Sequence, residues 1–137
     1  MSQARVQSGV GGRVAAVGAA VVLWGCATFG RGVPDVGGHW AGVVVVEGQT
    51  LEGELEVVQV GPALTVIFQA PALNLRATGD GQVHDDGSAR LQVEYDLQCP
   101  GVAEMSGDFT DQERSFRGSL VATDCSGELA GTFDFSR

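Results

Sequence analysis

The sequence predicts an all-β domain, a small eight-stranded antiparallel up-and-down barrel with one disulfide, which follows a signal peptide and a short tether. From Gly38 onward, apolar and polar residues alternate with period two, and no stretch has the period of a helix. Clusters of Gly, Pro, Asp and Asn separate the alternating segments. Glycines recur between apolar residues on the same face, as in "LEGEL", "MSGDF", "FRGSL" and "LAGTF", which favours a strongly bent sheet that closes on itself.

Residues 1–25 are predicted to form the signal peptide. Arg5 and Arg13 precede an apolar run from Val14 to Trp24, and no acidic residue occurs before Asp35. The run is too short to span a bilayer but has the length and charge of a secretory signal. Residues 1–25 are therefore excluded from the predicted fold.

The apolar run ends in Leu23-Trp24-Gly25-Cys26, which resembles the lipobox of bacterial lipoproteins. In that family, a Leu three residues before the Cys and a small residue directly before it direct lipidation of the thiol and cleavage in front of it. Trp24 departs from the pattern, because the family usually has a small residue there. The resemblance implies a diacylglyceryl anchor on Cys26, and Ala27 in place of Asp implies sorting to the outer membrane. The alternative is a buried Cys in an uncleaved anchor helix.

Residues 26–37 are predicted to be the lipidated Cys and a flexible tether. The segment Ala27–Gly37, "ATFGRGVPDVG", is rich in Gly and Pro and has no periodicity. The barrel domain is then expected to span residues 38–137.

Eight strands follow in order, and their registers can be predicted because directly opposed residues of an antiparallel pair point to the same face. The strands are expected at about 39–47, 51–60, 63–70, 72–83, 88–98, 103–110, 115–123 and 127–136. The expected inward pairs are Trp40 with Val57, Val57 with Val66, Phe68 with Leu73, Val83 with Ala89, Met105 with Leu120, and Leu120 with Leu129. On the outer face, the hairpin closed by Asp85-Asp86-Gly87 sets Arg76 opposite Asp96.

Cys99 and Cys125 are predicted to form the disulfide. With Cys26 lipidated, they are the remaining pair in an exported, oxidising compartment. Counting turns along an up-and-down barrel places both in loops at the same end, beside the sixth and seventh strands. Closing this loop is expected to stabilise the domain by roughly 3 to 4 kcal/mol.

Gly38-His39-Trp40 opens the first strand, and Arg137 ends the last. This arrangement resembles the lipocalin and avidin group of meander barrels, in which Gly-x-Trp plugs the closed end and an Arg from the final strand lies over the indole. The resemblance implies that Trp40 and Arg137 form a barrel plug, with a cation–π contact of about 0.5 to 1 kcal/mol. The disulfide end would then point away from the membrane and carry any mouth.

The inward side chains expected at the disulfide end form an apolar lining. They are Val46, Leu51, Phe68, Leu73, Leu97, Ala103, Leu120 and Leu129. They either line a ligand site or belong to the core. The core is the favoured interpretation, because eight-stranded barrels of short strands are usually filled by their own side chains.

The composition excludes some function classes. A net charge of -9, the absence of lysine and eight scattered arginines argue against nucleic acid binding. His39 and His84 lack the paired spacing of a zinc site, and no Gly-x-Ser-x-Gly motif occurs. Asp85-Asp86-Gly87 is explained by turn chemistry without calcium. We therefore expect no catalytic residues, no metal and no cofactor.

The membrane is the partner expected from the lipid anchor. A transmembrane barrel ranks below this expectation, because the strands are short and aromatic girdles are missing. The expected function is that of a membrane-anchored, non-catalytic envelope lipoprotein acting as an accessory or interaction module, with an envelope protein as partner. The alternative is a carrier of a small apolar ligand in the barrel mouth. A carrier needs an empty apolar cavity of at least about 300 Å³.

Overall fold

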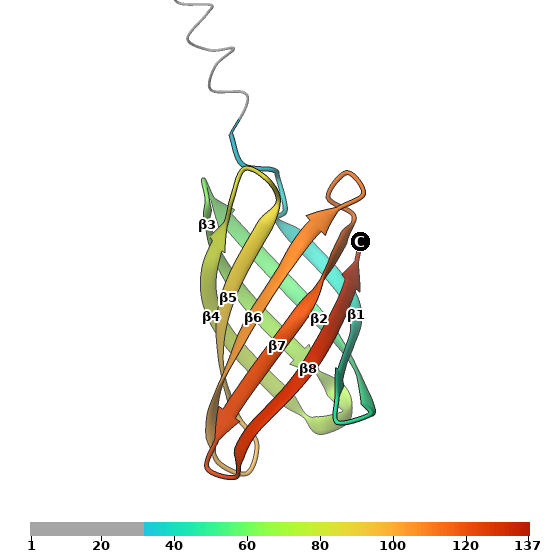
Figure 1. Cartoon of the computed structure of the whole chain (residues 1–137), viewed down its shortest axis with the longest axis vertical. Helices are drawn as coiled ribbons and strands as arrows, with labels where there is room; N and C mark the ends of the chain where they lie inside the picture. Colours follow the sequence, from blue (N-terminus) through green and yellow to red (C-terminus); the bar gives the residue numbers. More distant parts are fainter. Residues whose placement is uncertain (1–31) are drawn as a thin grey trace, which may run out of the picture. The chain divides into compact units, whose positions relative to one another are not determined.

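The computed structural model describes residues 32–137, which form a closed barrel of eight antiparallel strands (Figure 1). Each strand pairs with the next along the chain, and the last pairs with the first, which confirms the predicted fold class. Within the described residues, no helix is long and apolar enough to cross a membrane. The elements are β1 (Gly38–Val46), β2 (Gln49–Val60), β3 (Ala63–Ala70), the 3-10 turn η1 (Pro71–Leu73), β4 (Leu75–Val83), β5 (Ser88–Asp96), β6 (Pro100–Thr110), β7 (Ser115–Asp124) and β8 (Gly127–Ser136).

Three of the predicted registers are confirmed. Val57 lies opposite Val66, Val83 opposite Ala89, and Met105 opposite Leu120. In these hairpins the predicted turns, at Gly61-Pro62, at Asp85–Gly87 and at residues 111–114, agree with the structure. The position of a turn determines which residues of the two strands lie opposite each other.

The predicted register of β1 with β2 is wrong by two residues. Trp40 lies opposite Leu55 instead of Val57, because the chain reverses in a two-residue turn at Glu47-Gly48. Both turn residues have positive φ, 52° for Glu47 and 79° for Gly48, which is the conformation of a tight hairpin turn. A shift of two preserves the inward face, so the predicted core positions on these strands survive.

The same kind of error affects two other hairpins. Phe68 lies opposite Ala77 instead of Leu73, because η1 delays the start of β4. Leu120 lies opposite Gly131 instead of Leu129, because the β7–β8 turn is shorter than predicted.

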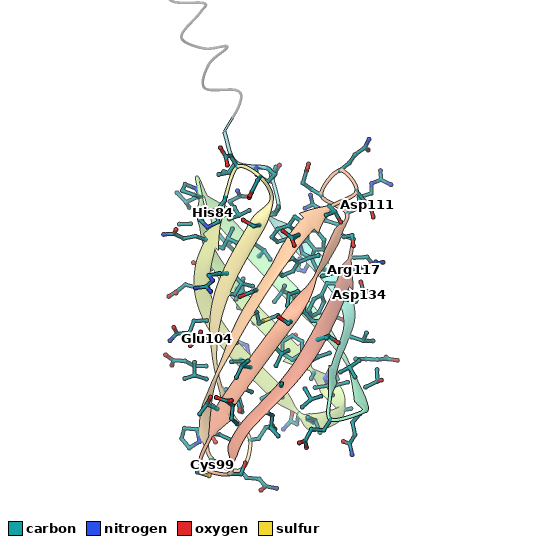
Figure 2. The ribbon with its side chains drawn as sticks, in the orientation of Figure 1. His84, Cys99, Glu104, Asp111, Arg117 and Asp134 are labelled. Carbon is teal, nitrogen blue, oxygen red and sulfur yellow. A yellow bond between two sulfur atoms is a disulfide. The ribbon has the colours of Figure 1, made fainter. Side chains whose placement is uncertain are left out.

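The predicted pairing of Arg76 with Asp96 is not formed. The β4–β5 ladder ends at Thr78 opposite Glu94, so both residues lie beyond its last pair. In the part of the chain that the structure describes, Arg117 and Asp134 form an ion pair at 3.2 Å, and Nε2 of His39 lies 3.6 Å from a carboxylate oxygen of Glu56. Figure 2 shows Arg117 and Asp134 side by side on the outer face of β7 and β8.

The inward glycines allow the sheet to bend tightly. A Cβ added to Gly118 would overlap the carbonyl oxygen of Ser106 on β6, and one added to Gly42 would overlap that of Asp134 on β8. Neighbouring backbones therefore approach too closely for any side chain, which agrees with the expectation that glycines permit barrel closure.

The prediction that residues 27–37 are wholly a tether is wrong for Val33–Gly37. Val36 is fully buried, and its backbone N–H donates to Oε1 of Gln59 at 2.8 Å. The Gln59 amide donates in turn to the carbonyl oxygen of Pro34 at 2.9 Å. The sequence of residues 33–37 alone could not predict this docking, because the docking depends on hydrogen bonds with Gln59 on β2.

The compact unit Val33–Arg137 contains all eight strands and the whole apolar core of the described residues. Its sheet closes on itself, so no strand edge depends on another segment. This unit can therefore be produced and measured by itself.

Candidate functional site

The two ends of the barrel are built differently. One end, here the sealed end, carries the β2–β3, β4–β5 and β6–β7 loops, the segment Val33–Gly37 and the C-terminus (Figure 1). The other end, here the open end, carries the β1–β2, β3–β4, β5–β6 and β7–β8 connections. Figure 2 shows Asp111 at the sealed end and Cys99 at the open end.

Aromatic side chains fill the sealed end. Trp40 and Phe116 are fully or almost fully buried, and the rings of Phe109 and Phe116 stack with centroids 4.0 Å apart. Trp40 meets Phe109 edge-to-face at 5.2 Å. Such contacts add about 0.5 to 1.5 kcal/mol per pair to the burial of the rings.

Arg137 closes the sealed end over Trp40. Its guanidinium carbon lies 4.6 Å from the centroid of the indole, the contact that the lipocalin resemblance implies. The indole Nε1 donates to the carbonyl oxygen of Val36 at 3.0 Å. The Arg137 guanidinium also donates to the carbonyl oxygens of Asp35, Gly37 and Glu113 at 2.8, 2.6 and 2.7 Å. Arg137 therefore ties the entering chain, the β6–β7 loop and the C-terminus together.

The predicted disulfide is confirmed and lies at the open end. Cys99 belongs to the β5–β6 loop and Cys125 to the β7–β8 turn, with Cα atoms 6.2 Å apart. The backbone N–H of Cys125 also lies 3.2 Å from Sγ of Cys99. The two loops that flank β6 and β7 are thus held together.

Most inward-facing apolar side chains at the open end are only half-buried, with Ala70 as a fully buried exception, whereas those at mid-barrel and at the sealed end are buried. The half-buried set comprises Val44, Val46, Leu51, Phe68, Leu75, Tyr95, Ala103, Ala122 and Leu129. The open end therefore presents apolar inner surface to solvent.

The predicted lining residues fall into three groups. Val46, Leu51, Phe68, Ala103 and Leu129 belong to the half-buried inner surface of the open end. Leu120 is 6% exposed and belongs to the core. Leu73 and Leu97 do not line the interior as predicted, because the chain leaves the strands before them, into η1 and the β5–β6 loop, where they are 48% and 49% exposed.

A hydrogen-bonded pair that the sequence analysis missed lies at the rim of the open end. The Tyr95 hydroxyl donates to Oδ2 of Asp124 at 3.0 Å. Both residues lie opposite Gly101, one from each side, and a side chain at Gly101 would collide with the Tyr95 ring. The glycine thus lets the ring cross β6. The sequence signal for this arrangement is that Gly101 lies directly opposite the aromatic Tyr95 on the neighbouring strand.

Asp124 is ionised at neutral pH. Its Oδ1 accepts from the backbone N–H of Ser126 at 2.8 Å and from the Ser126 hydroxyl. These bonds and the bond from Tyr95 lower the pKa of Asp124 from its ordinary value, because each stabilises the carboxylate. The pKa of Tyr95 is raised, first by burial and then by the hydrogen bond to Asp124 and its negative charge.

The titration of Tyr95 gives a direct check of this pair. Tyr95 is the only tyrosine of the chain, so the ultraviolet absorbance of phenolate reports on it alone. We expect an apparent pKa above the ordinary value of about 10. Because the folded pKa is raised, the associated stability is present below pH about 10 and is lost as the pH rises through the folded pKa.

The matched variant for this titration is Asp124→Asn. It keeps an acceptor for the hydroxyl but removes the charge, so the pKa of Tyr95 is expected to fall relative to the wild type. A wild-type pKa at or below the ordinary tyrosine value would contradict the described environment.

Two of the surface hollows lie on the outer face or beside the docked segment. One of about 500 Å³ lies beside the unpaired ends of β4 and β5, and one of about 390 Å³ lies beside Val33–Gly37. The lining of the first is Arg76, Thr78, Glu94, Tyr95, Asp96, Pro100, Gly101, Val102 and Thr123. Both mix polar and apolar groups and are broadly open to solvent.

One group of potential metal ligands occurs among residues 32–137. Ligand atoms of Cys99, Asp124 and Cys125 lie within 4.8 Å of one another. Both sulfur atoms are bonded to each other, so the group has no thiolate to offer. His39 and His84 lie apart from it, on β1 and in the β4–β5 turn. Cys26, the predicted lipidation site, lies outside the described residues.

Neither a protein-family model nor a curated protein matches the chain. Solved structures of small barrels do match. One, EF1p2_mFAP2b bound to DFHBI, has a TM-score of 0.66 at 14% identity and covers 74% of this chain and 93% of its own. The redesigned β-barrel mFAP1 bound to DFHBI has a TM-score of 0.61 at 18% identity, covering 74% and 94%. The redesigned β-barrel b11L5F_LGL has a TM-score of 0.61 at 17% identity, covering 74% and 90%. At these identities the likeness shows the fold alone.

Proposed function

We propose that this chain is an exported bacterial lipoprotein, anchored in the envelope through Cys26, whose barrel is a non-catalytic interaction module. The lipobox-like Leu23-Trp24-Gly25-Cys26 carries the anchor, and the docking of Val33–Gly37 at the sealed end is the observation that orients the barrel. Only residues 27–32 then separate Cys26 from the barrel, a reach of about 20 Å when fully extended. The membrane would lie on the side of the sealed end, and the open end would face away from it.

The disulfide supports the exported location, because such bonds persist in oxidising compartments. The filled aromatic core supports a binding role, because the interior of the sealed end has no room for a substrate. Exposed leucines at the open end, Leu73 and Leu97, offer apolar contacts to an envelope protein.

The anchor is tested by labelling bacteria that express the full chain with a fatty-acid analogue. The wild-type protein is expected to incorporate the label and to fractionate with membranes. Cys26→Ala is expected to lose the label and to move to the soluble fraction, whereas Cys99→Ala/Cys125→Ala, which removes the two disulfide-bonded cysteines, is expected to keep the label. Label retained by Cys26→Ala would show that Cys26 is not the lipidated residue.

A second candidate function is that of a carrier of small apolar ligands. The half-buried inner surface of the open end favours it, because apolar side chains exposed at a barrel mouth can contact a bound molecule. Two of the similar solved barrels are bound to DFHBI, which is compatible with ligand binding by this fold.

A further inference from the structure

We infer that the open end binds small apolar molecules that carry a positive charge, with Asp124 as the group that selects them. This inference rests on the carrier function and adds the chemical class of its ligand.

The apolar part of the site is the half-buried inner surface of the open end. Tyr95 and Phe68 contribute aromatic surface there, with Gly101 against the Tyr95 ring and Gly53 against the Phe68 ring. The small inward residues of this half are Gly53, Gly101, Ala103, Ala122 and Gly131. The sealed half also has small inward residues, such as Gly107 and Gly118, but the large rings of Trp40, Phe109 and Phe116 are buried there. A flat apolar ligand would therefore lie against half-buried side chains at the mouth of the barrel.

The charged part of the site is the Asp124 carboxylate, which follows Ala122 on the inward face of β7. It accepts three hydrogen bonds, whereas an ionised carboxylate has about four acceptor positions. Asp124 forms no salt bridge with a basic side chain of residues 32–137. The Asp124 carboxylate is ionised, lies beside apolar surface and has no positively charged partner among these residues. It therefore complements an apolar ligand that carries a positive charge.

The surrounding charges favour the same ligand. Glu47, Asp96 and Glu128 lie in or next to the connections of the open end, and the chain has no lysine. Arg76 is the one arginine of the described residues on this half. The other four lie on the sealed half, as Arg90, Arg114, Arg117 and Arg137. The open end therefore attracts cations and repels anions.

The aromatic ring of Tyr95 adds a second contact for a cation. A positive charge within about 6 Å of a tyrosine face gains about 0.5 to 1 kcal/mol at an exposed site. Tyr95 is held in place by its bond to Asp124, so both groups act on the same position.

The inference is tested by fluorescence titration of the unit Val33–Arg137 with three aromatic dyes that share one ring system. One dye is cationic, one neutral and one anionic. We expect the cationic dye to bind about tenfold more tightly than the neutral one at low salt, as for one partly exposed charge pair. The anionic dye is expected to bind more weakly than the neutral one, and added salt is expected to reduce the difference.

Three variants locate the selectivity. Asp124→Asn is expected to bring the cationic and neutral dyes to within about threefold, without weakening the neutral dye. Tyr95→Phe keeps the carboxylate and the ring but loses the hydrogen bond between them, so it is expected to retain a preference smaller than that of the wild type. Glu104→Gln removes a charge from the outer face of β6, away from the inner surface, and serves as the charge-matched control (Figure 2).

The outcomes distinguish failure of the cation preference from failure of the carrier function. Binding of all three dyes with equal affinity would overturn the cation preference and leave the carrier function standing. A preference that survives in Asp124→Asn would overturn the role of Asp124. Binding of none of the dyes by folded, disulfide-bonded protein would overturn both the carrier function and this inference.

Discussion

Replacing Trp40 with alanine is expected to lower the free energy of unfolding by about 3 to 5 kcal/mol. Trp40 is 1% exposed, so its removal leaves a large cavity at the sealed end. The change also removes the hydrogen bond to Val36 and the surface on which the Arg137 guanidinium lies. Because a small domain has only about 5 to 15 kcal/mol of stability, this loss is a large part of the total.

The measurement is urea unfolding of Val33–Arg137 followed by circular dichroism. Circular dichroism is preferred because the substitution removes the single tryptophan of this unit. Trp40→Phe is the control, since it keeps an aromatic ring against Phe109 and Phe116 and is expected to lose less than half as much stability. A loss below about 1 kcal/mol in Trp40→Ala would contradict the account of a packed, sealed end, because full burial of such a side chain is worth more.

Removing the disulfide is expected to cost about 3.5 kcal/mol in the chain-entropy model, since Cys99 and Cys125 are 26 residues apart. The double variant Cys99→Ala/Cys125→Ala removes the bond without leaving a free thiol. It also releases the two loops that flank β6 and β7 at the open end. The Tyr95–Asp124 bond lies beside these loops and is expected to weaken with them.

Urea unfolding of the double variant, and of the wild type with and without reductant, measures this effect. The reduced wild type is expected to match the double variant. Alkylation of the unreduced, unfolded wild-type unit is expected to find no free thiol at either position. Equal midpoints for the oxidised and reduced protein would show that the bond does not stabilise the domain.

Much of the fold could be predicted from the sequence because the barrel is a chain of local hairpins. Period-two alternation gave the eight strands, and the parity of inward positions was right even where the register was not. The registers failed at Glu47-Gly48, at Pro71–Leu73 and at the β7–β8 turn, where the number of residues in the turn depends on backbone geometry. The partner moved by two residues at the first and third of these turns and by four at the second, and an even shift changes the partner but not the face.

The candidate site was only partly predictable for a different reason. The half-buried Val46, Leu51 and Phe68 follow from the alternation, since each lies near the end of an apolar strand. The Tyr95–Asp124 pair joins residues on two strands that flank a third, and it depends on the missing side chain of Gly101. The alternation of apolar and polar residues within one strand does not show which side chains meet across a neighbouring strand. Likewise, the burial of Val36 depends on Gln59, a polar residue more than twenty positions away in the chain.

The central claim is that the barrel has one sealed end and one end at which it binds. Its most direct test is nuclear magnetic resonance of the isotope-labelled unit Val33–Arg137 titrated with the cationic dye. The account predicts that amide shifts cluster at the open end, at Tyr95, Gly101, Ala122 and Gly131, and that the Trp40 indole N–H, held by Val36, does not move. Shifts centred on the Trp40 indole, or spread over the outer face of the strands, would contradict it.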